Sequence, residues 1–245
     1  MRWQGEGLLL DVRKYGESSA LIDVFTLSLG RRIGLLRGAF NKKNKSIIQP
    51  GNQLFLTWNS RIEESLGVFK IELIKSRYYS ISKERNGLEL FNLICVLCST
   101  FLPERVDFDE LYNRTIHYVE GEFRTKEKFS KYIEWELQLL KSLGFGLDLG
   151  KCVVSGSKED LMFVSPKSGC AVSRKSSIGW EKKLLVLPDF LWSIKSTNSL
   201  SKADLANGFK LTEYFIKKNL QPVKKFQMGP FFDLRNRVLL SLKPF

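Results

Sequence analysis

Short apolar runs separated by glycine, proline and charged residues fill the first third of the chain. Five of these runs are rich in residues that favour strands, and they lie at 7–12, 20–26, 31–37, 53–58 and 67–74. Gly30 and the Pro50-Gly51 pair supply turns between them. Five short strands within about 75 residues are typical of a small β-barrel or sandwich.

Near residue 85 the spacing of apolar residues changes to the period of a helix. The pattern predicts helices at 88–101, 109–119, 125–143, from Ser201 onward, and at 231–242. Residues 145–182 are rich in Gly, Ser and Lys and are predicted as loops with short strands. The chain is therefore expected to be an α+β protein, with segments 1–80, 81–150, 151–182 and 183–245.

The charge along the chain is strongly uneven. Lys and Arg number 39 against 26 Asp and Glu, a net charge of +13. Residues 1–80 carry 13 basic and 7 acidic side chains, residues 81–150 carry 9 and 12, and residues 151–245 carry 17 and 7. A generally lysine-rich composition explains scattered lysines but not this contrast. The two basic ends indicate a polyanionic partner.

The most basic stretch is residues 31–45, which holds six cations and no acid. The cations are Arg31, Arg32, Arg37, Lys42, Lys43 and Lys45. We predict that they lie at a strand end and in a loop, where they would neutralise phosphates, although a merely solvated surface is the alternative. The aromatics Trp3, Tyr15, Phe40 and Trp58 in the same segment would let bases stack. Trp3 and Trp58 have core packing as their alternative.

The four cysteines form two pairs. Cys95 and Cys98 lie among apolar residues and are expected to be buried, reduced thiols. Cys152 and Cys170 each precede a serine by three residues, at Ser155 and Ser173, where a four-cysteine zinc ribbon would have cysteines. Because serine hydroxyls are poor zinc ligands, we expect a degenerate ribbon, no zinc and no other cofactor.

The sequence offers little for catalysis. His117 is the single histidine, and no G-x-x-x-x-G-K-[ST] motif is present. The acidic groups Glu63-Glu64 and Asp107/Asp109/Glu110 are explained by a hairpin tip and a helix start rather than by a metal-dependent nuclease site. We therefore expect a protein that is not an enzyme. The absence of a long apolar run and of a signal-peptide pattern favours the cytoplasm over a membrane.

Several motifs in order along the chain resemble the RecO family of bacterial DNA repair proteins. They are Gly7–Thr26, Gly30, Arg37-Gly38-Ala39, Gln49-Pro50-Gly51, Leu139–Cys152 and Phe163–Gly169. The resemblance implies an N-terminal OB-fold, an α-helical domain and a small zinc-ribbon-like insert packed with the helices. It also implies a recombination mediator of the nucleoid that binds single- and double-stranded DNA and anneals complementary strands.

The resemblance further implies three protein partners. The family pairs with RecR, helps to load RecA, and contacts the acidic C-terminal tail of single-stranded DNA-binding protein. Its DNA-contacting surface carries over to Arg31, Arg32 and Arg37, while Phe40, Lys42, Lys43 and Lys45 join it by aromaticity or charge. A cationic rim for the tail is predicted on the C-terminal helices, at Lys217, Lys218, Arg235 and Arg237. An RNA-binding OB protein remains the alternative, since basic grooves serve both polymers.

Overall fold

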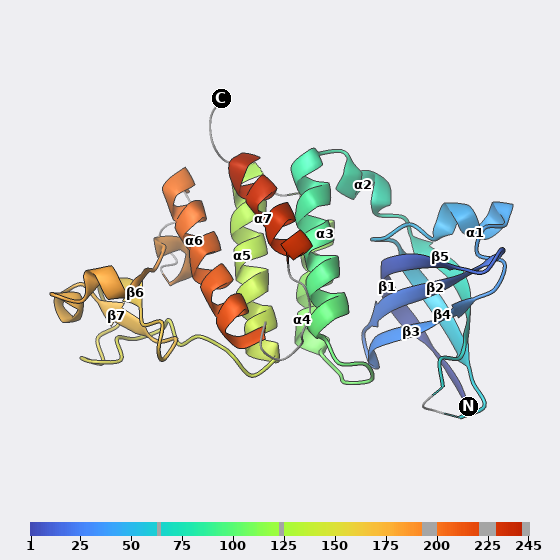
Figure 1. Cartoon of the computed structure of the whole chain (residues 1–245), viewed down its shortest axis with the longest axis horizontal. Helices are drawn as coiled ribbons and strands as arrows, with labels where there is room; N and C mark the ends of the chain where they lie inside the picture. Colours follow the sequence, from blue (N-terminus) through green and yellow to red (C-terminus); the bar gives the residue numbers. More distant parts are fainter. Residues whose placement is uncertain (63–64, 123–124, 193–199, 221–228, 242–245) are drawn as a thin grey trace. The chain divides into compact units, whose positions relative to one another are not determined.

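The computed structural model describes residues 1–62, 65–122, 125–192, 200–220 and 229–241. It divides into two compact units, Met1–Gly121 and Glu122–Phe245 (Figure 1). Glu63 and Glu64, expected at a hairpin tip, lie outside the described residues. None of the described helices combines the length and the apolar character that crossing a membrane requires.

The first unit is built on a closed five-stranded barrel. Its strands are β1 (Arg2–Tyr15), β2 (Ser19–Thr26), β3 (Gly30–Leu36), β4 (Gln53–Asn59) and β5 (Val68–Lys75), in the order β1-β2-β3-β5-β4. β1 pairs with β4 through its first half and with β2 through its second half, which closes the barrel. The parallel pairing of β3 with β5 completes the arrangement. The α+β class and the N-terminal OB-fold are thereby confirmed.

Alternation along the strands fills the barrel with aliphatic side chains. Every second residue of β2 is buried there, at Ala20, Ile22 and Val24. Between β3 and β4 the chain forms a short helix, α1 (Lys42–Ile47), which the sequence pattern did not predict. Ile47 and Ile48 join the barrel core and so fix this helix to it.

Three further helices belong to the first unit: α2 (Tyr78–Ser82), α3 (Arg85–Phe101) and α4 (Asp109–Glu120). The buried Asn52 ties α2 to the barrel, because its side chain accepts from the Arg77 N–H at 3.0 Å and donates to the Ile47 carbonyl at 2.8 Å. The rings of Phe25 on β2 and Tyr112 on α4 meet edge to face at 5.3 Å. The compact unit extends to Gly121 and so takes in α3 and α4 as well as the barrel.

The second unit consists of helices and a small sheet. The helices are α5 (Thr125–Ser142), α6 (Lys202–Phe215), a π-helical turn (Ile216–Leu220) and α7 (Gly229–Ser241). Ser201 caps α6 as expected, in a reciprocal capping box with Asp204. Strands β6 (Leu161–Val164), β7 (Ala171–Ser173) and β8 (Leu185–Val186) form a three-stranded sheet in the order β7-β6-β8. Short 3-10 turns connect β7, β8 and the segment that follows them.

Candidate nucleic-acid interface

Four exposed cations of the first unit lie on and beside α1. Arg37 follows β3, and Lys42, Lys43 and Lys45 lie on α1; all four side chains are exposed. The side chain of Asn41 caps the helix by accepting from the Asn44 N–H at 2.7 Å. The predicted loop is therefore a short, capped helix that presents its lysines to solvent.

Hydrogen bonds hold α1 and the neighbouring turn in place. The Asn44 side-chain amide donates to the Gly38 carbonyl at 3.0 Å. The Ala39 N–H donates to the Ser18 carbonyl at 2.8 Å, which joins the β3–α1 connection to the β1–β2 turn. These hydrogen bonds hold Arg37 and the lysines of α1 in one region.

Arg31 has a different place from the one that the sequence suggested. It is only 7% exposed, and its guanidinium forms a two-pronged ion pair with Asp23, with Nη2–Oδ2 at 2.7 Å. Its Nη1 also donates to the Leu102 carbonyl at 3.4 Å. Burial raises the pKa of Asp23, although Arg31 acts to lower it. Arg31 is therefore the internal counter-charge of Asp23 and does not form part of the exposed interface.

Arg32 is also largely buried. It is 9% exposed, and its guanidinium lies 5.6 Å from the centroid of the Trp58 ring. This places Arg32 at the rim of the barrel interior, so it too leaves the predicted DNA-contacting set. Both burials were missed because the sequence alone does not distinguish an arginine that forms a buried contact from one that faces water.

The aromatic residues divide into two groups. Trp58 is buried in the barrel core and Trp3 packs partly against it, so the alternative reading holds for both. The Trp58 indole N–H donates to the Leu66 carbonyl at 3.1 Å. Phe40 and Tyr15 are exposed, by 38% and 56%. These two rings are the ones that remain accessible to a base.

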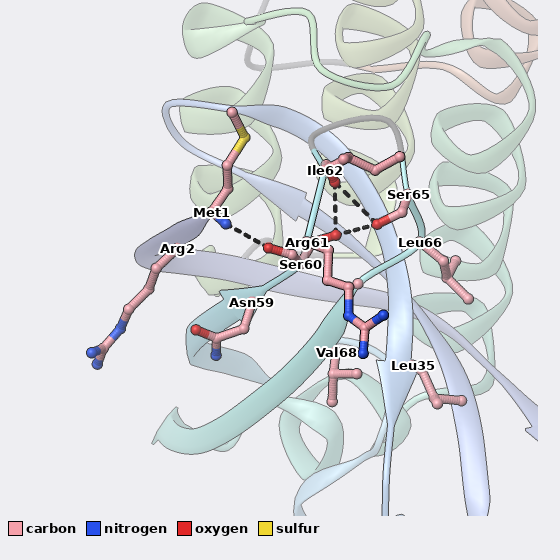
Figure 2. Close-up of a pocket in the computed structure, with 11 residues that line it drawn as sticks. Met1, Arg2, Leu35, Asn59, Ser60, Arg61, Ile62, Ser65, Leu66 and Val68 are labelled. Carbon is pink, nitrogen blue, oxygen red and sulfur yellow. Dashed lines mark hydrogen bonds between the residues drawn. The ribbon is translucent and has the colours of Figure 1, made fainter.

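A wide, open cavity of about 1120 Å³ lies where β1 begins and β4 runs into β5 (Figure 2). Its lining includes the aliphatic side chains of Leu35, Leu66 and Val68 beside polar and cationic ones. Figure 2 shows the Arg61 side chain extending toward Val68, whereas Arg2 extends away from the other lining residues. Leu35 belongs to β3, so the cavity adjoins the outer surface of that strand.

The small sheet of the second unit surrounds the Cys152 thiol with serine donors. Burial acts to raise the pKa of Cys152, but hydrogen bonds from the side chains and backbone of Ser155 and Ser173 outweigh it and lower this pKa to about 5. Cys170 is half-buried. Two thiols and two hydroxyls do not match the four thiolate or imidazole ligands of a structural zinc site. The described residues contain no cluster of three or more His, Cys, Asp or Glu side chains suited to a metal.

The four cations predicted to bind an acidic tail differ in their surroundings. Arg235 is fully buried and pairs with Glu136, so it cannot form a surface rim. Lys218 donates to the Pro166 and Lys167 carbonyls at 2.6 and 3.0 Å. Lys217 pairs with Glu213 and lies 4.4 Å from the centroid of the Phe232 ring. Arg237 is exposed on α7. The rim is thereby reduced to Lys217, Lys218 and Arg237.

Comparison with known proteins gives matches over most of the chain. Residues 1–77 match the family model described as recombination protein O N terminal, and residues 88–226 match that described as recombination protein O C terminal. A DNA repair protein RecO of Cereibacter sphaeroides is 40% identical over 241 residues, covering 98% of this chain and 99% of the relative. RecO proteins of Roseobacter denitrificans and Methylocella silvestris are 40% and 34% identical, covering 90% of this chain and 90% and 88% of the relatives.

Proposed function

Because the chain belongs to the RecO family of DNA repair proteins, we propose that it binds single- and double-stranded DNA through the exposed cations around α1 and anneals complementary strands. The family assigns it to DNA repair and recombination. The cations that carry the proposal are Arg37, Lys42, Lys43 and Lys45, referred to below as the α1 surface.

The observation that carries this function is the composition of the α1 surface. Four exposed cations lie within nine residues, and no acid occurs anywhere in residues 31–45. Such a surface releases counterions from DNA when it neutralises phosphates, so it binds without sequence preference and weakens as salt rises. Binding of this kind exchanges rapidly, which suits a protein that must bring two strands together and then leave.

Annealing requires no bond-making side chain. It requires two phosphate chains to approach each other, and a cationic surface lowers their mutual repulsion. We therefore propose that the protein acts stoichiometrically rather than as an enzyme, and without a metal. The positive charge of the α1 surface supports this proposal, because it can neutralise phosphates on both strands.

The protein partners proposed for this chain follow from its family. They are RecR and the C-terminal tail of single-stranded DNA-binding protein. Together with RecR, the chain would help to load RecA onto strands that single-stranded DNA-binding protein covers. For the acidic tail, the accessible cations are Lys217, Lys218 and Arg237 on the second unit. Lys217 lies beside the half-buried ring of Phe232, which supports a peptide that is both acidic and apolar. A location on the nucleoid is part of the same proposal.

The test is a salt titration of binding to fluorescent oligo-dT and to a duplex of equal length, with an annealing assay on complementary strands. We expect affinity that falls steeply with salt, and faster annealing. Replacing Lys42, Lys43 and Lys45 by glutamate should weaken binding to both DNAs and reduce the salt slope on single strands by about 2, at ~0.7 per phosphate contact. An unchanged slope in this variant would remove the α1 surface from the proposal.

A competition experiment addresses the alternative polymer. Equal-length DNA and RNA strands compete for the wild-type protein at one salt concentration. Equal or stronger binding of DNA is the expected result. A marked preference for RNA would favour an RNA-binding OB protein, because the 2′-hydroxyl would then contribute to recognition.

A further inference from the structure

We propose that the Tyr15 end of the outer face of β1–β2–β3 is a single-strand-selective subsite, in which Tyr15 stacks on an unpaired base and Arg13 and Arg37 hold the flanking phosphates. The inference rests on the proposed DNA-binding function and extends it beyond the α1 surface. It adds Arg13 to the interface and makes Tyr15 the residue that distinguishes single strands from duplexes.

The strand register places these residues on one face. Arg13 on β1 lies opposite Leu21 on β2, and Leu21 lies opposite Leu35 on β3. The next row, Lys14, Ala20 and Leu36, contains the core residues Ala20 and Leu36 and so faces the interior. The row of Arg13 therefore faces outward, because successive residues alternate between the two faces of a sheet.

The following outward row is formed by Tyr15 and Ser19, which are opposite each other. Arg37 follows the last residue of β3 directly, in a turn, and its side chain is exposed. The hydrogen bond from Ala39 N–H to the Ser18 carbonyl keeps the β3–α1 connection next to the β1–β2 turn. Tyr15 and Arg37 are thus held at the same end of the barrel.

The surface has the composition that a single strand requires. Tyr15 is 56% exposed, and the half-buried side chains of Leu21 and Leu35 form an apolar strip beside it. Exposed cations border the strip and continue onto α1: Arg13, Arg37, Lys42, Lys43 and Lys45. The exposed acids beside them are Asp11, which pairs with Arg13 at 3.2 Å, and Glu17 in the turn. An exposed pair of this kind contributes little and yields to a phosphate.

Selectivity follows from the ring rather than from the cations. A duplex presents phosphates but keeps its bases stacked inside, whereas a single strand can turn a base onto an aromatic side chain. Lysines of the α1 surface therefore serve both DNAs, while Tyr15 serves the single strand alone. Leu35 also lines the cavity of Figure 2, so the apolar strip continues toward the β4–β5 connection.

The experiment measures binding of the full chain to oligo-dT and to an equal-length duplex at one moderate salt concentration. Tyr15→Ala should weaken oligo-dT binding about tenfold, the range expected for one lost base stack, and leave duplex binding unchanged. Tyr15→Phe should bind like the wild type, since the ring is retained. Tyr79→Ala is the matched control: Tyr79 is 73% exposed in the same unit but lies on α2.

Three results would overturn the subsite. They are equal loss of both DNAs in Tyr15→Ala, no loss of either, or the same loss in Tyr79→Ala. Each of these leaves the proposed function intact as long as the wild type binds and the lysine variant does not. Failure of the wild type to bind either DNA at low salt would instead overturn the proposed function, and the subsite with it.

Discussion

Arg235 and Glu136 form an ion pair in the interior of the second unit, with both side chains fully buried. Arg235 Nη2 donates to Glu136 Oε2 at 3.0 Å, to the Phe209 carbonyl at 2.9 Å and to Thr212 Oγ1 at 2.7 Å. The Tyr132 and Thr212 hydroxyls each donate to the Glu136 carboxylate at 2.6 Å. The network joins α5, α6 and α7, so a residue that looked like a surface cation connects three helices.

Removing one partner of this pair should be costly. In Arg235→Ala the Glu136 carboxylate stays buried without its counter-charge, and we expect a loss of about 3–5 kcal/mol in the free energy of unfolding. Urea denaturation of the full chain measures it. Replacing both residues, as Arg235→Met with Glu136→Leu, should recover much of the loss because no buried charge is left. A double variant no more stable than Arg235→Ala would contradict this account.

A matched pair of arginines separates structural from DNA-binding roles. Arg31→Ala leaves Asp23 buried without its ion pair, so we expect a loss of about 3–5 kcal/mol in the free energy of unfolding. Arg37→Ala removes an exposed cation, and its stability should stay within about 0.5 kcal/mol of the wild type. Oligo-dT binding should weaken in Arg37→Ala with a salt slope lower by about 0.7. A stable Arg31→Ala protein with selectively impaired DNA binding would reverse the two assignments.

Most of the strands and helices could be predicted from the sequence, whereas the short helices could not. Strand and helix periods identified the five barrel strands and the five long helices, because burial of alternating or helically spaced apolar side chains is a property of local sequence. The short α1 and α2 were missed. Helix α1 depends on the Asn41 cap and on Ile47 entering a core formed by distant strands.

The candidate site was predictable only in part, for a related reason. Residues 31–45 were correctly recognised as basic, but the burial of Arg31 depends on Asp23 and Leu102, which are distant in sequence. The outward position of Tyr15 depends on the register of β1 with β2, which composition does not reveal. Arg13 and Tyr15 are two residues apart, as residues on one face of a strand are. This spacing was the sequence signal that could have placed them on the same face.

The Cys152 thiolate should make stability depend on pH. Its pKa of about 5 in the folded protein lies below the ~8.5 of a cysteine in an unfolded chain. Between these values the unfolded chain binds a proton that the folded protein does not, so the free energy of unfolding rises with pH. The stability difference between wild type and Cys152→Ala should therefore grow from pH 5.5 to pH 8, as measured by urea denaturation.

Cys98→Ala supplies the control for this titration. Burial raises the pKa of Cys98 above its usual value, so its thiol stays neutral over the same range. Its replacement should cost a pH-independent amount, set by the small cavity it leaves. A Cys152→Ala difference that stays constant with pH would mean that the Cys152 thiol is neutral as well.

The serines around Cys152 also predict how a metal site can be rebuilt. Ser155 and Ser173 both donate hydrogen bonds to the Cys152 sulfur, so their side chains already reach the position that zinc ligands would occupy. Ser155→Cys together with Ser173→Cys would complete a four-cysteine set with Cys152 and Cys170. We expect this double variant to bind one zinc ion per chain and to become more resistant to urea when zinc is present.

The wild type and each single variant provide the comparison, measured as zinc per chain by elemental analysis after purification with zinc and dialysis. The wild type should retain no stoichiometric zinc, because hydroxyls do not replace thiolates as ligands at neutral pH. A three-cysteine variant should bind more weakly than the double variant, since it lacks the fourth thiolate. One zinc retained by the wild type would contradict this expectation. It would show that Cys152 and Cys170 bind zinc together with other donors.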